Sequence, residues 1–158
     1  MRPLNILIAE DNEDDAFILT HALKSAGLPN PVFICRDGQE AVDYIKGIGS
    51  FADRAKYPLP GLLILDIKMP RLSGLEVLRW VRTHPACAVI PTIILTSSAH
   101  PKDVAEAFEN GVNAYFLKPR TSDEMRDLLQ LIHKFWTASV LPPSQQLQTD
   151  GQACPSRP

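Results

Sequence analysis

Short apolar segments of strand length alternate five times with segments of helical period along this chain. The strand candidates are residues 4–9, 32–35, 62–65, 91–95 and 114–117. The helix candidates are residues 14–26, a segment that Asp37-Gly38 opens, and residues 74–83, 101–110 and 122–136. Strands that alternate with helices pair in parallel, and right-handed crossovers place helices on both faces of the sheet. The sequence therefore predicts an α/β fold with a doubly wound, five-stranded parallel sheet.

Two segments lie outside this alternation. Residues 47–60 contain several Gly and Pro residues, which favours a long exposed loop with an irregular turn. Residues 137–158 hold four prolines among Ser, Gln and Gly, and they offer too little apolar surface to offset the entropy of ordering. We expect one domain over residues 1–136 and a disordered tail over 137–158, too short for an effector domain.

Charge and composition narrow the classes of partner. The chain has 16 Lys and Arg against 18 Asp and Glu and no basic run, so electrostatics gives no reason to expect a nucleic acid or an anionic membrane. No apolar segment approaches the roughly 20 residues of a bilayer span, and no secretory signal is apparent. Three cysteines without metal-ligand spacing favour reduced thiols. We expect a soluble, cytoplasmic protein without nucleic acid or membrane partners.

Reactive side chains follow four of the five predicted strands. Glu10 and Asp11 follow the first strand, Asp66 the third, Thr96 the fourth and Lys118 the fifth. The carboxyl ends of parallel strands meet at one edge of a sheet, where ligands bind in open α/β folds. We therefore expect three carboxylates, a hydroxyl and an ammonium group to lie together.

This set of groups suits phosphoryl chemistry beside a divalent cation. Three close carboxylates repel one another, and an all-oxygen site without His or Cys favours Mg²⁺, with Mn²⁺ as the alternative. Asp66 ends the most apolar strand and can act as a desolvated nucleophile that forms an acyl phosphate. Thr96 and Lys118 can then bind phosphoryl oxygens.

Each of these residues also has an ordinary structural explanation. An acidic pair before a helix often compensates the helix dipole, a Thr after a strand is often a turn residue, and a Lys before Pro is often solvated. Chance would scatter these residues along the chain, so their positions after successive strands favour a shared functional site. Two other functions remain as alternatives: an aspartyl-phosphate phosphohydrolase, which needs an acid where Lys68 stands, and a phosphorylation-independent binding module. A nucleotide-binding protein is disfavoured because no Gly-rich phosphate loop is present.

The motifs around these residues resemble the response-regulator receiver domains, which are also called CheY-like. The resemblance covers roughly residues 4–136 and rests on Ile-Leu-Ile-Ala-Glu10-Asp11, Leu-Ile-Leu-Asp66-Ile-Lys-Met-Pro, Ile-Ile-Leu-Thr96-Ser97 and Ala-Tyr115-Phe-Leu-Lys118-Pro119.

The resemblance implies a role for each position of the site. Asp66 is the phosphoacceptor, while Thr96 and Lys118 hold the phosphoryl oxygens. Asp11 binds Mg²⁺ directly, Glu10 binds it through water, and Lys68 offers its backbone carbonyl. Tyr115 is an aromatic rotamer switch coupled to Thr96, and Lys118-Pro119 carries a cis peptide bond.

The resemblance also implies partners. A sensor histidine kinase, of the bacterial phytochrome type, phosphorylates the domain, which acts as a signalling protein with self-catalysed phosphotransfer and not as a metabolic enzyme. Its output is an unidentified protein or a phosphotransfer protein. A homodimer through the fourth helix, fifth strand and fifth helix is a further expectation. Phe135 and Trp136 either extend a dimer contact of Phe108 and Tyr115, or Phe135 belongs to the core and Trp136 covers the edge of the sheet.

Overall fold

The computed structural model describes residues 4–140 and contains a five-stranded sheet with strand order β2-β1-β3-β4-β5. Every neighbouring pair of strands is parallel. The strands are β1 (Ile6–Ala9), β2 (Val32–Cys35), β3 (Leu62–Leu65), β4 (Thr92–Thr96) and β5 (Ala114–Leu117). The predicted doubly wound parallel sheet is confirmed.

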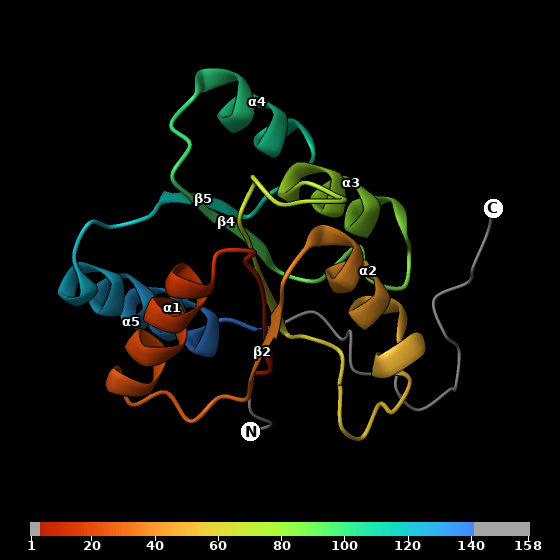
Figure 1. Cartoon of the computed structure of the whole chain (residues 1–158), viewed down its shortest axis with the longest axis horizontal. Coiled ribbons are helices and arrows are strands. Elements are labelled where there is room, and N and C mark those ends of the chain that lie inside the picture. Colours follow the sequence, from red (N-terminus) through yellow and green to blue (C-terminus); the bar gives the residue numbers. More distant parts are fainter. Residues whose placement is uncertain (1–3, 141–158) are drawn as a thin grey trace.

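Helices cover both faces of the sheet. They are α1 (Glu13–Ser25), α2 (Gly38–Lys46), α3 (Gly74–Thr83), α4 (Pro101–Glu109) and α5 (Ser122–Ala138). Figure 1 shows α1 and α5 side by side on one face, with α2, α3 and α4 on the other. Within residues 4–140, none of these helices combines the length and the apolar character that crossing a bilayer requires.

Alternation along the central strands builds two separate cores. Leu7 and Ala9 of β1 pack in the cluster with α2 and α3, whereas Ile6 and Ile8 pack with α1 and α5. Successive side chains of a strand point to opposite faces, so a strand covered on both sides must be apolar throughout. β1, β3 and β4 are buried along their whole lengths, which makes the strand ends beside them a rigid base for a site.

Side-chain caps determine where the helices begin. The side chain of Asn12 accepts a hydrogen bond from the backbone N–H of Asp15 at the start of α1, and Asp37 and Thr121 cap α2 and α5 in the same way. Ser73 and Glu76 form a reciprocal capping box at the start of α3. Such caps satisfy backbone donors that the first turn leaves unpaired, and α1 thereby starts directly after the acidic pair.

The loop of residues 47–60 contains a short 3₁₀ helix (Gly49–Phe51), which agrees with the predicted irregular turn. Arg54 anchors this loop: its guanidinium group donates hydrogen bonds to the backbone carbonyls of Tyr44, Ile45 and Tyr57. Two of these carbonyls lie in the last turn of α2, where a cation also complements the helix dipole.

Several boundaries differ from the sequence expectations. β1 begins at Ile6 and not at residue 4, β4 includes Thr96, and α5 continues two residues past 136. The predicted tail lies mainly in residues 141–158, outside the described residues. The expected cis Lys118-Pro119 bond was wrong, since the bond is trans, the form that X–Pro bonds favour by about 0.5–1 kcal/mol.

Candidate functional site

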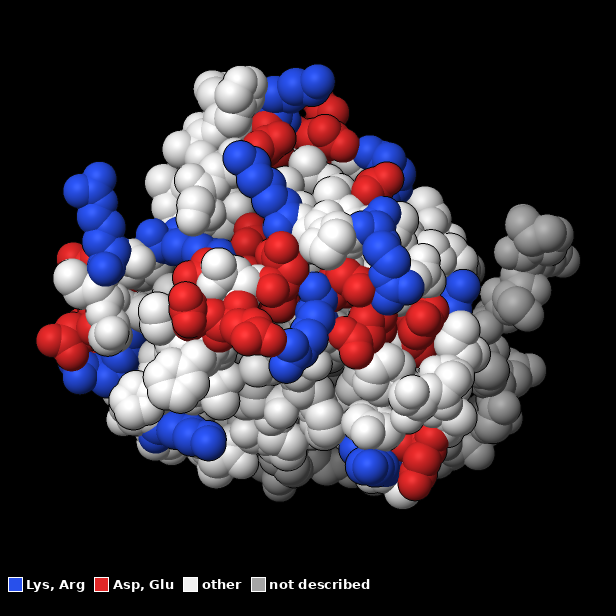
Figure 2. Space-filling view, in the orientation of Figure 1, with Lys and Arg blue, Asp and Glu red and all other residues white. Residues whose placement is uncertain are grey.

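The predicted site residues meet at the carboxyl edge of the sheet, between β1 and β3, where the order of the strands reverses. All of them except Tyr115 line a cavity of about 260 Å³, together with neighbouring polar side chains. Figure 2 shows Asp and Glu side chains gathered in the middle of this face of the molecule, with Lys and Arg side chains among them. The cavity is lined by Glu10, Asp11, Asn12, Asp15, Asp66, Lys68, Thr96, Ser97, Ser98 and Lys118.

Asp66 lies directly after β3 and is held on both carboxylate oxygens. Its side chain accepts a hydrogen bond from the backbone N–H of Ile67 at 2.7 Å through Oδ1, and from Lys118 Nζ at 2.8 Å through Oδ2. Only 8% of the residue is exposed. A carboxylate that is fixed and nearly dehydrated at the edge of the sheet is well placed to act as a nucleophile.

Glu10 and Asp11 complete a carboxylate trio with Asp66. One oxygen of each group lies within 4.8 Å of the others. Glu10 is buried, and burial raises its pKa to about 7, although the hydrogen bond from Lys118 opposes the rise; the charge of Asp66 adds to it. Asp11 is exposed. Three oxygen ligands at this spacing, with two of them buried, fit the donor set that Mg²⁺ or Mn²⁺ requires.

Lys118 lies at the centre of the acidic groups. Its Nζ is 2.6 Å from Glu10 Oε2, 2.7 Å from Asp15 Oδ2 and 2.8 Å from Asp66 Oδ2. Burial alone lowers the pKa of an ammonium group, but the hydrogen bonds to Asp15, Asp66 and Glu10 outweigh burial and hold the pKa of Lys118 above its usual range. The lysine is therefore a permanent positive charge beside Asp66.

Asp15 is the site residue that sequence reasoning missed. It lies in the first turn of α1, four residues after Asp11, and its carboxylate contacts Lys118 across the fold. The available signal was helical geometry: a residue in the first turn after a strand-end acidic pair stays close to that edge of the sheet. An acidic residue in that turn also has an ordinary explanation in the helix dipole, which hides its second role.

Thr96 and Tyr115 are linked through Ser98. Thr96 is buried at the end of β4, and its Oγ1 accepts a hydrogen bond from the backbone N–H of Ser98 at 3.3 Å. The hydroxyl of Tyr115 donates to the backbone carbonyl of Ser98 at 2.7 Å. Tyr115 is half-buried and lies outside the cavity lining. Thr96 and Tyr115, the predicted switch pair, are therefore both hydrogen-bonded to the backbone of Ser98 in the β4–α4 loop.

Lys68 lines the cavity two residues after Asp66, with an exposed side chain. Its ammonium group cannot serve as the general acid of a phosphohydrolase that uses a carboxyl group at this position. The backbone carbonyl of Lys68, which the resemblance implies as a ligand of the cation, belongs to a residue that lines this cavity.

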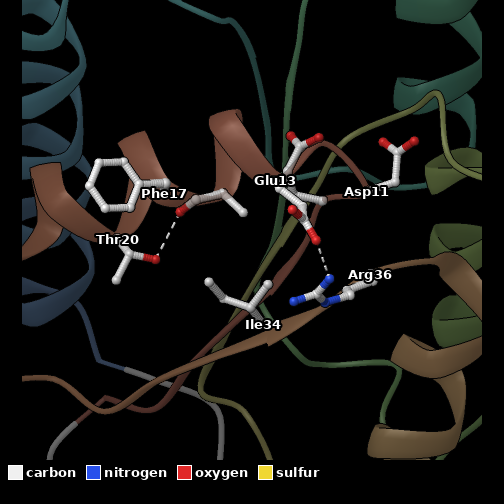
Figure 3. A pocket seen from close by; sticks show the side chains of 8 residues that line it. Asp11, Glu13, Phe17, Thr20, Ile34 and Arg36 are labelled. Carbon is white, nitrogen blue, oxygen red and sulfur yellow. Dashed lines mark hydrogen bonds and ion pairs between the residues drawn. The ribbon is translucent and has the colours of Figure 1, made fainter.

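A second cavity of about 400 Å³ opens beside the acidic site, between α1 and the edge strand β2 (Figure 3). Phe17 of α1 and Ile34 of β2 line it, and both are exposed, at 71% and 37%. At the end near Asp11, Glu13 and Arg36 form an ion pair of 2.6 Å across the opening. Both members are exposed, so this pair contributes little to stability.

Comparisons with known proteins agree with this geometry. The family described as the response regulator receiver domain matches residues 6–130. Response regulator Rcp1 of Synechocystis sp. is 31% identical over 142 residues, which cover 90% of this chain and 95% of Rcp1. The solved structure of the Mn²⁺-bound form of Rcp1 has a TM-score of 0.79 to this fold, covering 89% of this chain and 99% of that chain.

Two further solved structures are similar over nearly their whole lengths. The phosphorylated cyanobacterial phytochrome response regulator RcpA is 29% identical, with a TM-score of 0.82, and covers 89% of this chain and 99% of that chain. RPA3017, a response regulator in red light signalling of R. palustris, is 34% identical, with a TM-score of 0.83, and covers 88% and 98%. With its strand-end acidic site and a family match over residues 6–130, the chain belongs to the response regulator receiver domain family of two-component systems.

Proposed function

We propose that Asp66 accepts a phosphoryl group from the phosphohistidine of a sensor histidine kinase. A carboxylate oxygen of Asp66 attacks phosphorus, the P–N bond to the histidine breaks, and the imidazole leaves as the neutral ring with the proton that its other nitrogen already carried. The product is an acyl phosphate on Asp66. The observation that carries this proposal is the contact of buried Asp66 with Lys118 inside a trio of carboxylates.

The residues around Asp66 have separate tasks in this reaction. Glu10, Asp11, Asp66 and the backbone carbonyl of Lys68 would hold Mg²⁺ or Mn²⁺, which supplies positive charge for the transferred group when bound. Lys118 donates to a phosphoryl oxygen, and Thr96 donates its hydroxyl to another. Asp66 and Lys118 are already in contact before transfer, which lowers the reorganisation that the reaction demands of them.

Phosphorylation changes the surface through Ser98. When the Thr96 hydroxyl turns to the phosphoryl group, the N–H of Ser98 loses its acceptor, and the loop that also holds Tyr115 is released. Tyr115 can then take another rotamer, which biases the surface of α4, β5 and α5 between two states. Partner binding follows this change of surface.

The phosphoryl donor that we propose is a bacterial phytochrome histidine kinase in the cytoplasm. RcpA is described as a phytochrome response regulator and RPA3017 as a red light signalling protein, and both are similar to this chain over about nine-tenths of its length. The output is a second protein or a phosphotransfer protein, since the signalling role requires the phosphorylated surface to be bound.

A second copy of this chain is the proposed partner of the β5–α5 surface. Leu117, Leu131 and Phe135 are 51%, 61% and 61% exposed there, which is high for large apolar side chains. A groove of about 430 Å³ is lined by Phe116, Leu131, Phe135 and Trp136 with neighbouring residues of β4, β5 and α5, while Leu117 lies outside its lining. A twofold arrangement would place the exposed apolar groups of one copy against those of the other.

The experiment that tests phosphorylation is the intact mass of the protein after incubation with acetyl phosphate and Mg²⁺, followed by a cold quench. Wild type is expected to gain one phosphoryl group, whereas Asp66→Asn and wild type in EDTA are expected to gain none. Asp53→Asn is the matched control, because Asp53 is an exposed aspartate of the loop after α2 and should leave the adduct intact. An adduct that persists in Asp66→Asn would place the acceptor elsewhere.

A further inference from the structure

Asp15 is a fourth carboxylate at the site, and it reaches Lys118 from a different element than the other three. Asp15 lies in the first turn of α1, while Glu10 and Asp11 follow β1 and Asp66 follows β3. Its Oδ2 is 2.7 Å from Lys118 Nζ, as close as the contact of Lys118 with Asp66 at 2.8 Å. The Asp15 side chain is 39% exposed, against 1% for Glu10.

The ammonium group of Lys118 has no donor left for a new acceptor. A lysine side chain carries three N–H donors, and three carboxylates surround the Nζ at 2.6 to 2.8 Å. For Lys118 to donate to a phosphoryl oxygen, one of these three contacts must be lengthened or shared. The strength of the Asp15 contact therefore affects how readily Lys118 donates a hydrogen bond to the transferred phosphoryl group.

The orientation of Lys118 does not depend on Asp15 alone. Its side chain is 10% exposed, and both Glu10 and Asp66 hold its Nζ in the same position. Removal of the Asp15 charge therefore leaves the lysine in place. What changes is electrostatic: a neutral acceptor holds the N–H of Lys118 more weakly than a carboxylate does, so a phosphoryl oxygen takes it more readily, and one fewer negative charge lies near the incoming dianionic group.

The negative charge of Asp15 has the opposite effect on the binding of a cation. Four carboxylates and the ammonium groups of Lys68 and Lys118 line the cavity, so the loss of one carboxylate lowers the negative potential at the carboxylate trio. A cation is bound less tightly in a less negative site, while an anion is accepted more readily. A purely structural role of Asp15 would not produce this pair of opposite effects.

We propose that Asp15 is a positioning residue that acts through Lys118: it retains one N–H of the ammonium group, slows phosphoryl transfer to Asp66 and strengthens binding of the divalent cation. This inference rests on the proposed function of Asp66. It assigns to the first turn of α1 a control over the rate of phosphoryl transfer.

The test compares Asp15→Asn with Asp14→Asn. Asp14 lies in the same turn of α1 and loses the same charge, but it is exposed and lies outside the cavity lining. At saturating Mg²⁺, Asp15→Asn is expected to be phosphorylated by acetyl phosphate about fivefold faster than wild type, a modest coupling for contacting charges. Its dissociation constant for Mg²⁺, measured by calorimetry, is expected to rise by a similar factor. Asp14→Asn should stay close to wild type in both measurements.

A metal-free measurement separates this inference from the proposed function. In ¹⁵N-detected spectra without Mg²⁺, the ammonium signal of Lys118 should exchange slowly with water in wild type and in Asp14→Asn, and faster in Asp15→Asn. Equal exchange in all three proteins, an unchanged or slower transfer in Asp15→Asn, or equal effects of both variants would overturn the proposal. A wild type that takes no phosphoryl group while the exchange difference persists would refute the proposed function and leave the Asp15–Lys118 contact established.

Discussion

Gly74, the first residue of α3, lies against the backbone carbonyl of Asp66, and a Cβ at position 74 would stand 2.0 Å from that oxygen. The backbone N–H of Gly74 also donates to the carbonyl of Ile67 at 2.9 Å. The turn after the proposed phosphoacceptor is thus closed by direct contact of two backbones. A side chain at position 74 has no space unless this turn moves.

Gly74→Ala should therefore destabilise the fold and displace Asp66. We expect the free energy of unfolding to fall by about 3 kcal/mol, because the clash involves backbone atoms that cannot rotate away. Urea unfolding gives the value. Gly27→Ala is the control: its φ of +70° carries left-handed strain, but no atom lies within 4 Å of its Cβ, so a loss of about 1 kcal/mol is expected. Equal losses in the two variants would contradict the steric argument.

Much of the fold could be predicted from sequence because each central strand is covered on both faces. Such strands must be apolar along their whole length, and the central segment 62–65 matches its predicted bounds. The edge strands at 32–35 and 114–117 match their predicted bounds as well, although they are only partly buried. The carboxylate trio and Lys118 could be predicted for a related reason: in a parallel sheet, the residues that follow the strands meet at one edge.

The remaining features depend on tertiary geometry. The contact of Asp15 with Lys118 joins residues 103 positions apart, and Arg54 ends at carbonyls of α2 that no local pattern indicates. Phe17 is 71% exposed because the buried stripe of α1 is formed by Leu19, Ala22 and Leu23. Phe17 is as apolar as the core residues of α1, so the sequence alone does not show that its side chain is exposed.

Tyr115→Phe should favour the phosphorylated state. The variant loses the 2.7 Å hydrogen bond to the Ser98 carbonyl, which lowers the free energy of unfolding by about 1 kcal/mol. If phosphorylation releases Tyr115, only the unphosphorylated state loses this bond. Binding of beryllofluoride with Mg²⁺, a mimic of the phosphoryl group, should then tighten by about fivefold. Titration of wild type, Tyr115→Phe and Tyr57→Phe measures the effect, and unchanged affinity in Tyr115→Phe would separate Tyr115 from the switch.

The two described cysteines should resist thiol reagents while the protein is folded. Cys35 and Cys87 are 0% and 1% exposed, and burial, with the charges of nearby acidic residues, raises the pKa of the Cys35 thiol well above its usual range. In a Cys154→Ser background, no thiol should react with Ellman's reagent at pH 8, and two should react after unfolding in urea. A fast-reacting thiol in the folded protein would contradict the buried placement.

The raised pKa of Cys35 also predicts a loss of stability in alkali. The folded protein keeps the thiol proton at pH values where the unfolded chain releases it. The contribution is therefore fully present below the unfolded pKa of about 8.5 and declines as the pH rises above it. Urea unfolding between pH 7 and pH 10 should show a steeper decline for wild type than for Cys35→Ala. Parallel declines would show that Cys35 titrates alike in both states.

Phe135→Lys should abolish the proposed dimer without unfolding the domain. The Phe135 side chain is 61% exposed, so a lysine there costs the monomer little, whereas a charge buried at an interface without a partner is strongly unfavourable. Sedimentation velocity with Mg²⁺ and acetyl phosphate is expected to show a dimer for wild type and a monomer for Phe135→Lys. Phe17→Lys is the matched control, because Phe17 is 71% exposed on α1 and should leave the dimer intact. A monomeric wild type, or dissociation by Phe17→Lys alone, would show that the β5–α5 surface does not bind a second copy of this chain.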